Sequence, residues 1–172
     1  MSFYKNILTG LMLLSVNLTL AINVSAASNC DQRNSIINKQ IFNLTNFTKN
    51  IDTNLKNLTS SAQEKIHIAT RFNLDQDLVK KLQDDIPIMQ NLENTQADFY
   101  KTQANYLQKI VGLSCTDAQR KSLALELQTW YNSNKENSSK LSQFFTEKWI
   151  PDNKALSALI IEYNQSVNKM KK

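Results

Sequence analysis

The sequence contains very few of the residues that make tight turns. Its 172 residues include only two glycines and two prolines. Sheet-rich and loop-rich folds need turn formers at many positions, so this scarcity favours helices. It also excludes two catalytic frameworks, because phosphate-binding loops and serine-hydrolase elbows both depend on glycines that this chain does not have.

Metal-ligating residues are equally scarce. His67 is the only histidine, and the two cysteines do not form a Cys-x-x-Cys pair. One imidazole cannot build a typical zinc site alone, and the chain has no c-type haem attachment sequence. The acidic cluster Asp75, Asp77, Asp84 and Asp85 lacks the spacing of a calcium-binding loop. We therefore expect no metal, no cofactor and no enzymatic activity.

Runs of one charge sign are absent as well. The chain has 20 basic and 15 acidic residues, a net charge of +5. Loss of the leader described next removes one lysine and no acid, which leaves 19 minus 15, or +4. The lysines and arginines are scattered, so we expect no nucleic-acid partner.

Residues 1–26 have the pattern of a cleaved secretory signal peptide. Lys5 supplies a positive start, residues 7–21 form a short apolar core, and Val24-Ser25-Ala26 places small residues at the cleavage site. The apolar run is short for a bilayer and contains Asn17 and Thr19, so we expect no stable membrane span after cleavage. The remaining residues, 27–172, are predicted to form one helical-bundle domain.

The two cysteines lie beyond the leader, at Cys30 and Cys115. An even cysteine count in an exported chain predicts a disulfide, the alternative being two free thiols. Together with the leader, this bond predicts a periplasmic or secreted protein.

A helical pattern begins at the first cysteine and organises the rest of the chain. Steps of four and three residues place one narrow apolar stripe on a helix that we expect to end near Phe72. The stripe contains Cys30, Asn34, Ile37, Ile41, Leu44, Thr48, Ile51, Leu55, Leu58, Ala62, Ile66 and Ala69. Such a seam needs partner helices, as in a coiled coil.

Two later stretches repeat this pattern. We predict a turn at residues 73–75, a second helix capped by Asp75, and a left-handed end at Gly112. Pro87 predicts a kink or a break in that helix. A third helix is predicted to begin after a Thr116 cap and to break at Pro151.

The predicted fold is therefore an all-α, elongated, up-down-up antiparallel helical bundle. It has three long helices with a heptad-like seam and a shorter fourth helix after Pro151. Antiparallel arms of about forty residues would bring Cys30 beside Cys115, whereas parallel arms would separate them far beyond bonding reach.

Two groups of side chains are candidates for recognition. Thr48, Gln96 and Asn134 lie 18 or 19 residues from the disulfide along their helices, so we expect one polar layer that sets register, or alternatively lines a ligand pocket. An aromatic group on the third helix is either core or an exposed partner surface, depending on whether the last helix covers it. It comprises Trp130, Tyr131, Phe144, Phe145 and Trp149.

These features favour an exported, non-enzymatic protein-binding bundle, such as an inhibitor, an immunity protein or a secretion-system component. The alternative is a periplasmic chaperone or a bundle that binds lipid or a small ligand. The expected partner is another protein, and homodimerisation along an uncovered seam is a further expectation. The sequence itself does not identify that partner.

Overall fold

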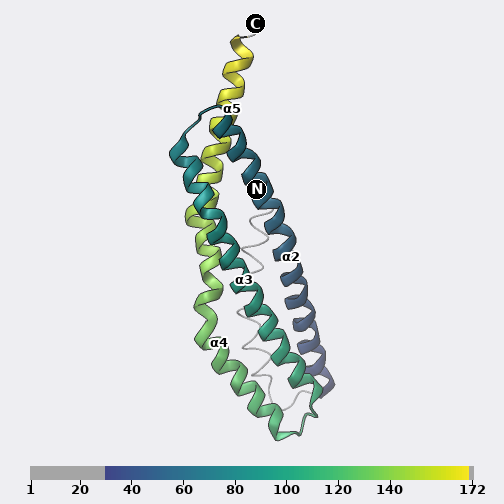
Figure 1. The fold of residues 1–172 in the computed structure, drawn as a ribbon. Coiled ribbons are helices and arrows are strands. Elements are labelled where there is room, and N and C mark those ends of the chain that lie inside the picture. The colour runs from purple at the N-terminus through teal and green to yellow at the C-terminus, as the bar shows by residue number, and fades with distance from the viewer. Residues whose placement is uncertain (1–29, 171–172) are drawn as a thin grey trace. The chain divides into compact units, whose positions relative to one another are not determined.

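The computed structural model describes residues 30–170, and the predicted signal peptide lies outside this range. The helices are α2 (Cys30–Arg71), α3 (Gln76–Gly112), α4 (Ala118–Phe144) and α5 (Ile150–Met170), with a π-helical segment η1 (Phe145–Trp149) before α5 (Figure 1). Residues 30–170 contain no strand. The prediction of an all-α helical bundle is confirmed.

The described residues fall into two compact units, and each unit takes one segment from every helical run. Unit 1 comprises 30–51 and Asn94–Ser142, and unit 2 comprises Asp52–Glu93 and 143–170. Each boundary falls inside a continuous helix. The single domain expected from the sequence therefore stays a prediction, and each unit is described below by itself.

Unit 1 has a core of aliphatic and aromatic side chains from α2, α3 and α4. Leu44, Leu107 and Leu127 are each at most 1 % exposed. The buried cluster comprises Ile37, Leu44, Phe99, Tyr100, Ala104, Leu107, Ile110 and Leu127. Ile37 and Leu44 belong to the stripe expected for the first helix, so the helical period located the part of this core that α2 contributes.

Unit 2 contains the turn between α2 and α3. Asn73 has φ 50°, the left-handed conformation, and the N–H of Leu74 donates to the carbonyl of Ala69 at 2.9 Å. The N–H of Asn73 donates to the carbonyl of Thr70, which completes a Schellman ending. Asp75 Oδ1 then accepts the N–H of Leu78 at 3.0 Å. The predicted turn and its Asp75 cap are both confirmed.

Two predicted caps around the second connection are wrong. No described glycine has a positive φ, so Gly112 ends α3 without a left-handed turn. The N–H of Leu113 donates to the carbonyl of Ile110, and the guanidinium of Arg120 donates to the carbonyl of Leu113, the residue after α3, at 3.0 Å. Asp117, not Thr116, caps α4, because Asp117 Oδ1 accepts the N–H of Gln119 at 2.8 Å.

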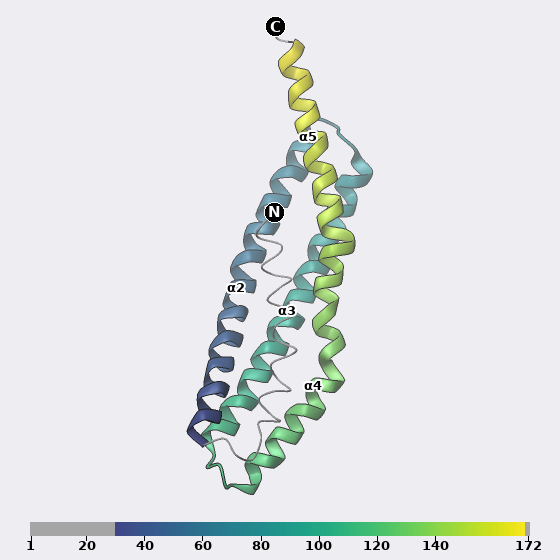
Figure 2. The ribbon, with the colours of Figure 1, turned by 180° about the vertical axis from the view of Figure 1, so that it is seen from behind.

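Neither proline breaks its helix. α3 continues through Pro87. Pro87 and Gln83, whose carbonyl loses its hydrogen bond, are both exposed, so water can satisfy that carbonyl. The break expected at Pro151 is also absent, because η1 joins α4 to α5 without interruption (Figure 2). The predicted fourth helix is thus the continuation of the third.

The π-helical segment corrects the phase of the buried residues. Leu141, Phe145, Trp149 and Asn153 are all buried and succeed one another at steps of four. In an α-helix each such step would rotate the side chain by about 40° away from the core. The N–H of Ile150 donates to the carbonyl of Phe145, and this wider turn holds one extra residue and cancels the accumulated drift.

We expect Asp75→Ala to lower the free energy of unfolding by about 1 kcal/mol, because the N–H of Leu78 loses its acceptor. Urea unfolding followed by circular dichroism measures this change. Asp75→Asn is the matched control, since it keeps a side-chain oxygen at the same position. Equal losses in the two variants would show that the cap does not stabilise α3.

Candidate functional site

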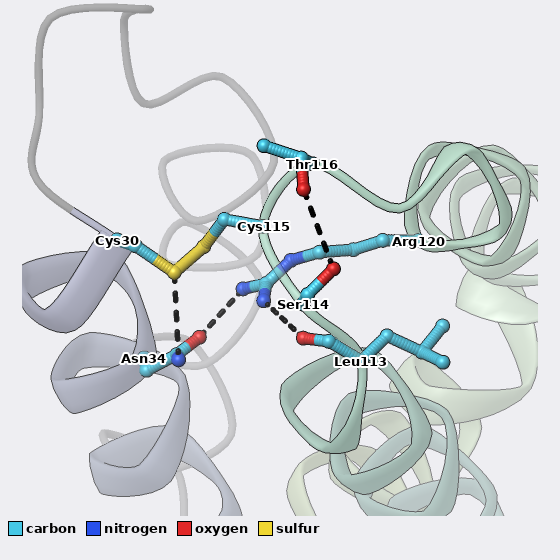
Figure 3. Close-up of a disulfide and its surroundings, with 7 residues drawn as sticks. All are labelled: Cys30, Asn34, Leu113, Ser114, Cys115, Thr116 and Arg120. Atoms are coloured by element: carbon cyan, nitrogen blue, oxygen red, sulfur yellow. Dashed lines mark hydrogen bonds between the residues drawn. A yellow bond between two sulfur atoms is a disulfide. The ribbon is translucent and has the colours of Figure 1, made fainter.

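A disulfide in unit 1 joins the first residue of α2 to the loop that follows α3. Cys30 and Cys115 are bonded, with their Cα atoms 5.9 Å apart, which confirms the predicted bridge (Figure 3). This pairing requires α2 and α3 to run antiparallel within unit 1. The chain-entropy model gives about 4 to 5 kcal/mol for a closed loop of this length.

Arg120 adds a polar clasp beside the disulfide. Its guanidinium donates to Asn34 Oδ1 at 2.6 Å as well as to the carbonyl of Leu113 (Figure 3). The amide of Asn34 in turn lies 3.8 Å from the sulfur of Cys30. Burial, and then the charge of Arg33, lowers the pKa of Arg120. The clasp therefore connects α2, the end of α3 and the start of α4.

The aromatic residues predicted as a partner surface do not form one surface. In unit 1, Trp130 stacks on Phe99 with ring centroids 4.9 Å apart, and Tyr131 packs on the same ring. Both are half-buried against the unit 1 core. In unit 2, Phe144 and Phe145 are each 7 % exposed and Trp149 is fully buried. These three side chains are core residues and offer no surface to a partner.

The three residues of the predicted polar layer lie in unit 1, but their hydrogen bonds are local. Thr48 Oγ1 donates to the carbonyl of Leu44, and Asn134 Nδ2 donates to the carbonyl of Trp130. Gln96 is fully buried, and neither of its amide atoms meets a partner with hydrogen-bond geometry. No described hydrogen bond joins the three, so the layer remains a prediction.

Buried ionisable groups in unit 2 were largely missed by the sequence analysis. Lys65 Nζ donates to Asn153 Oδ1 at 2.5 Å. Burial lowers the pKa of Lys65, and the negative charge of Glu64 partly opposes that shift. Burial, followed by the charges of Asp152 and Asp84, raises the pKa of Asp85, while Lys148 opposes the shift. Contacts of this kind position α5 on the rest of unit 2.

Glu93 is the most strongly perturbed of these groups. Its side chain is buried at 5 % exposure, and Oε1 has no hydrogen-bond partner. Burial, with a smaller contribution from Asp52, raises the pKa of Glu93 to about 8, and Lys56 opposes the shift. Helical spacing does not single out Glu93, because Glu93 and its neighbour Leu92 lie four and three residues after buried Met89 and are equally placed to face the core.

Unit 2 also presents a groove on its surface between α2 and α3. Its volume is about 450 Å³, and it is open to solvent. The lining residues are Gln63, Ile66, His67 and Thr70 from α2, with Gln83 and Ile86 from α3. We call this the α2–α3 groove. The stripe expected for the first helix contained Ile66, but no pattern in the sequence brought these six residues together.

The groove is equipped for binding rather than for bond-making chemistry. It contains one imidazole and no carboxylate, thiol or amine, so it lacks the partnered groups that acid–base catalysis requires. Within residues 30–170, no group of three histidine, cysteine or acidic side chains is arranged to hold a metal ion. None of the helices in that range has a long enough apolar stretch to cross a membrane.

Comparison of the chain with protein-family models, with curated proteins and with solved structures found no match.

We expect the stability of the protein to fall as pH rises from about 4.5 to about 8, because Glu93 holds its proton in the folded state but not in the unfolded state. The limiting slope for one proton is about 1.4 kcal/mol per pH unit. Urea unfolding at pH 5 and pH 8 measures it. Glu93→Gln should flatten the profile, whereas Glu162→Gln, an exposed control in the same unit, should leave it unchanged. A Glu93→Gln profile as steep as that of the wild type would contradict this assignment.

We expect the double variant Cys30→Ser/Cys115→Ser to lose about 4 to 5 kcal/mol of unfolding free energy, because the unfolded chain regains its loop entropy. Chemically reduced wild-type protein is the control and should unfold at the same urea concentration. A double variant as stable as the oxidised protein would show that the loop constraint contributes nothing.

Proposed function

We propose that the protein is an exported, non-enzymatic binding protein that holds an amphipathic helix of another protein in the α2–α3 groove. One observation carries this proposal: an open groove of about 450 Å³ is lined by two isoleucines and by four polar side chains, none of which is an acid, a lysine or an arginine. Ile66 is only 8 % exposed, so it forms the apolar base, and Ile86 is half-buried beside it.

The lining favours a particular kind of partner. Because no lysine, arginine, aspartate or glutamate lines the groove, an occupant is selected by apolar fit and hydrogen bonding rather than by ion pairs. The glutamine amides, the threonine hydroxyl and the imidazole can bond polar groups at the edge of a helix. The two isoleucines accept aliphatic or aromatic side chains.

The dimensions of the groove favour a helical occupant. On α2 it extends from Gln63 to Thr70, about 10 Å at helical rise, or two turns. A helix that lies between two others presents anchors at i and i+3 or i+4, and anchors one turn apart fit within that length. The volume lies at the low end of ligand sites, which suits a few anchoring side chains.

The compartment and the lack of catalysis are part of the same proposal. The disulfide fits an oxidising compartment, and the pattern of residues 1–26 supports export to the periplasm or the medium. Asp85 and Glu93, the carboxyls whose pKa burial raises, are buried in unit 2 and do not line the groove. This arrangement supports a binding role over a catalytic one.

A site-specific photo-crosslinker tests this proposal. We expect p-benzoylphenylalanine at exposed Gln83 to capture a protein from the envelope or culture medium of the source organism, whereas the same label at exposed Ser61, outside the groove, captures none. A synthetic peptide covering the crosslinked segment should form a helix on binding. Its affinity, measured by calorimetry, should fall at least tenfold for Thr70→Arg, which places a bulky cation in the groove.

Ser61→Arg is the matched control for this measurement, because it adds the same side chain to an exposed position of the same helix. Peptide affinity equal in the two arginine variants would overturn the proposal. Crosslinks from Gln83 to many unrelated unfolded proteins would also contradict it and would indicate a chaperone.

A further inference from the structure

We propose that the α2–α3 groove receives the C-terminal tip of α5 from a second copy of this chain when no other partner occupies it. This inference rests on the proposed function, since it assumes that the groove accepts an amphipathic helix. It adds a specific occupant and a reciprocal dimer contact.

The α5 tip, defined as residues 164–170, extends past the turn of its own unit. Lys65 bonds Asn153 and Phe72 stacks on Tyr163 with centroids 4.5 Å apart, so α2 and α5 run parallel. α2 ends at Arg71, one residue before Phe72, and the chain then turns back. Within unit 2, the ribbon of α5 accordingly continues beyond the α2–α3 turn (Figures 1 and 2).

The tip carries the apolar stripe of α5 into solvent. Leu156 is fully buried, and the same face continues at helical spacing through Tyr163, Val167 and Met170. Val167 is half-buried, while Met170 is 78 % exposed, so burial decreases along the stripe. An apolar face at an exposed helix end is stabilised when another apolar surface covers it.

The lengths of the tip and the groove match. From Tyr163 to Met170 the helix rises by about 10 Å, and from Gln63 to Thr70 it rises by the same amount. Val167 and Met170 lie three residues apart, which is the spacing of paired anchors in helix-in-groove recognition. Two such anchors correspond to the two isoleucines of the groove.

A second copy fits better than an unrelated helix because both halves of the contact lie at the same end of unit 2. The groove begins three residues before the α2–α3 turn, and the tip begins where α5 passes that turn. Two copies that meet end to end around a twofold axis can each insert a tip into the other's groove. Such an isologous contact forms twice in one dimer.

The charges at this end are compatible with that arrangement. Lys169 lies on the tip, and Lys171 and Lys172 follow it in the sequence. The groove lining carries no lysine or arginine that would repel them.

Analytical ultracentrifugation of the exported, oxidised protein tests the inference. Because the contact is small, we expect a dimer with a Kd on the order of 10–100 µM. Met170→Glu should weaken the dimer at least tenfold by charging the tip, and Thr70→Arg should do the same by blocking the groove. Both positions are exposed, so both variants keep the fold, which circular dichroism verifies.

The controls are Ile161→Glu, on another face of α5, and Ser61→Arg, outside the groove, and each should dimerise as the wild type does. A mixture of Met170→Glu and Thr70→Arg should associate more strongly than either variant alone, because the mixed dimer keeps one intact tip and one intact groove that meet. A wild type that stays monomeric at 500 µM, or a mixture that gains nothing, would overturn the inference.

Each of the two proposals can be rejected without rejecting the other. Loss of peptide binding in Thr70→Arg, together with a monomeric wild type, would support the proposed function and reject the self-contact. A dimer that depends on Met170 and Thr70, together with no groove-specific crosslink to another protein, would support the self-contact and the helix-accepting groove, and would reject the partner from another protein.

Discussion

The bond between Cys30 and Cys115 is the constraint on which the order of helices in unit 1 depends. It places the first residue of α2 beside the chain that leaves α3, so those two helices must run antiparallel. Arg120 extends the constraint to α4 by donating to Asn34 and to the carbonyl of Leu113. The covalent bond acts mainly on the unfolded chain, whereas the arginine acts in the folded state. Together they determine the relative placement of three chain segments.

The buried face of α3 is more polar than the apolar seam of a typical coiled coil. Asp85, Glu93, Gln96 and Gln103 are all buried. Burial of such groups costs free energy unless they are hydrogen-bonded, and Glu93 Oε1 and the Gln96 amide lack partners of suitable geometry. Polar positions in a helical seam can specify which helices pair and in which register. The stability of the fold therefore comes from the aliphatic and aromatic layers between these groups, such as Leu82, Met89 and Leu107.

The sequence predicted the fold class and the first turn because both depend on local rules, and it predicted the disulfide because only two cysteines are present. The period located Ile37 and Leu44, and Asp75 is a local cap. The sequence placed the end of α3 at Gly112 but not its conformation, because the N–H of Leu113 donates to the carbonyl of Ile110 without a left-handed residue. It did not predict the burial of Glu93 or the groove, because both depend on how α2 and α3 face each other. The expectation that proline breaks a helix was wrong at Pro151, because a wider, π-helical turn directly precedes it.

The π-helical turn at Phe145–Trp149 holds one residue more than an ordinary α-helical turn. If that residue were removed, the segment would wind as an ordinary α-helix and α5 would keep its orientation about its axis, because the wide turn adds a residue without adding rotation. Asn153 would still face Lys65, and Leu156 would stay in the interior of unit 2. The segment therefore has one dispensable residue, whereas a further insertion wound as α-helix would turn all of α5 by about 100°.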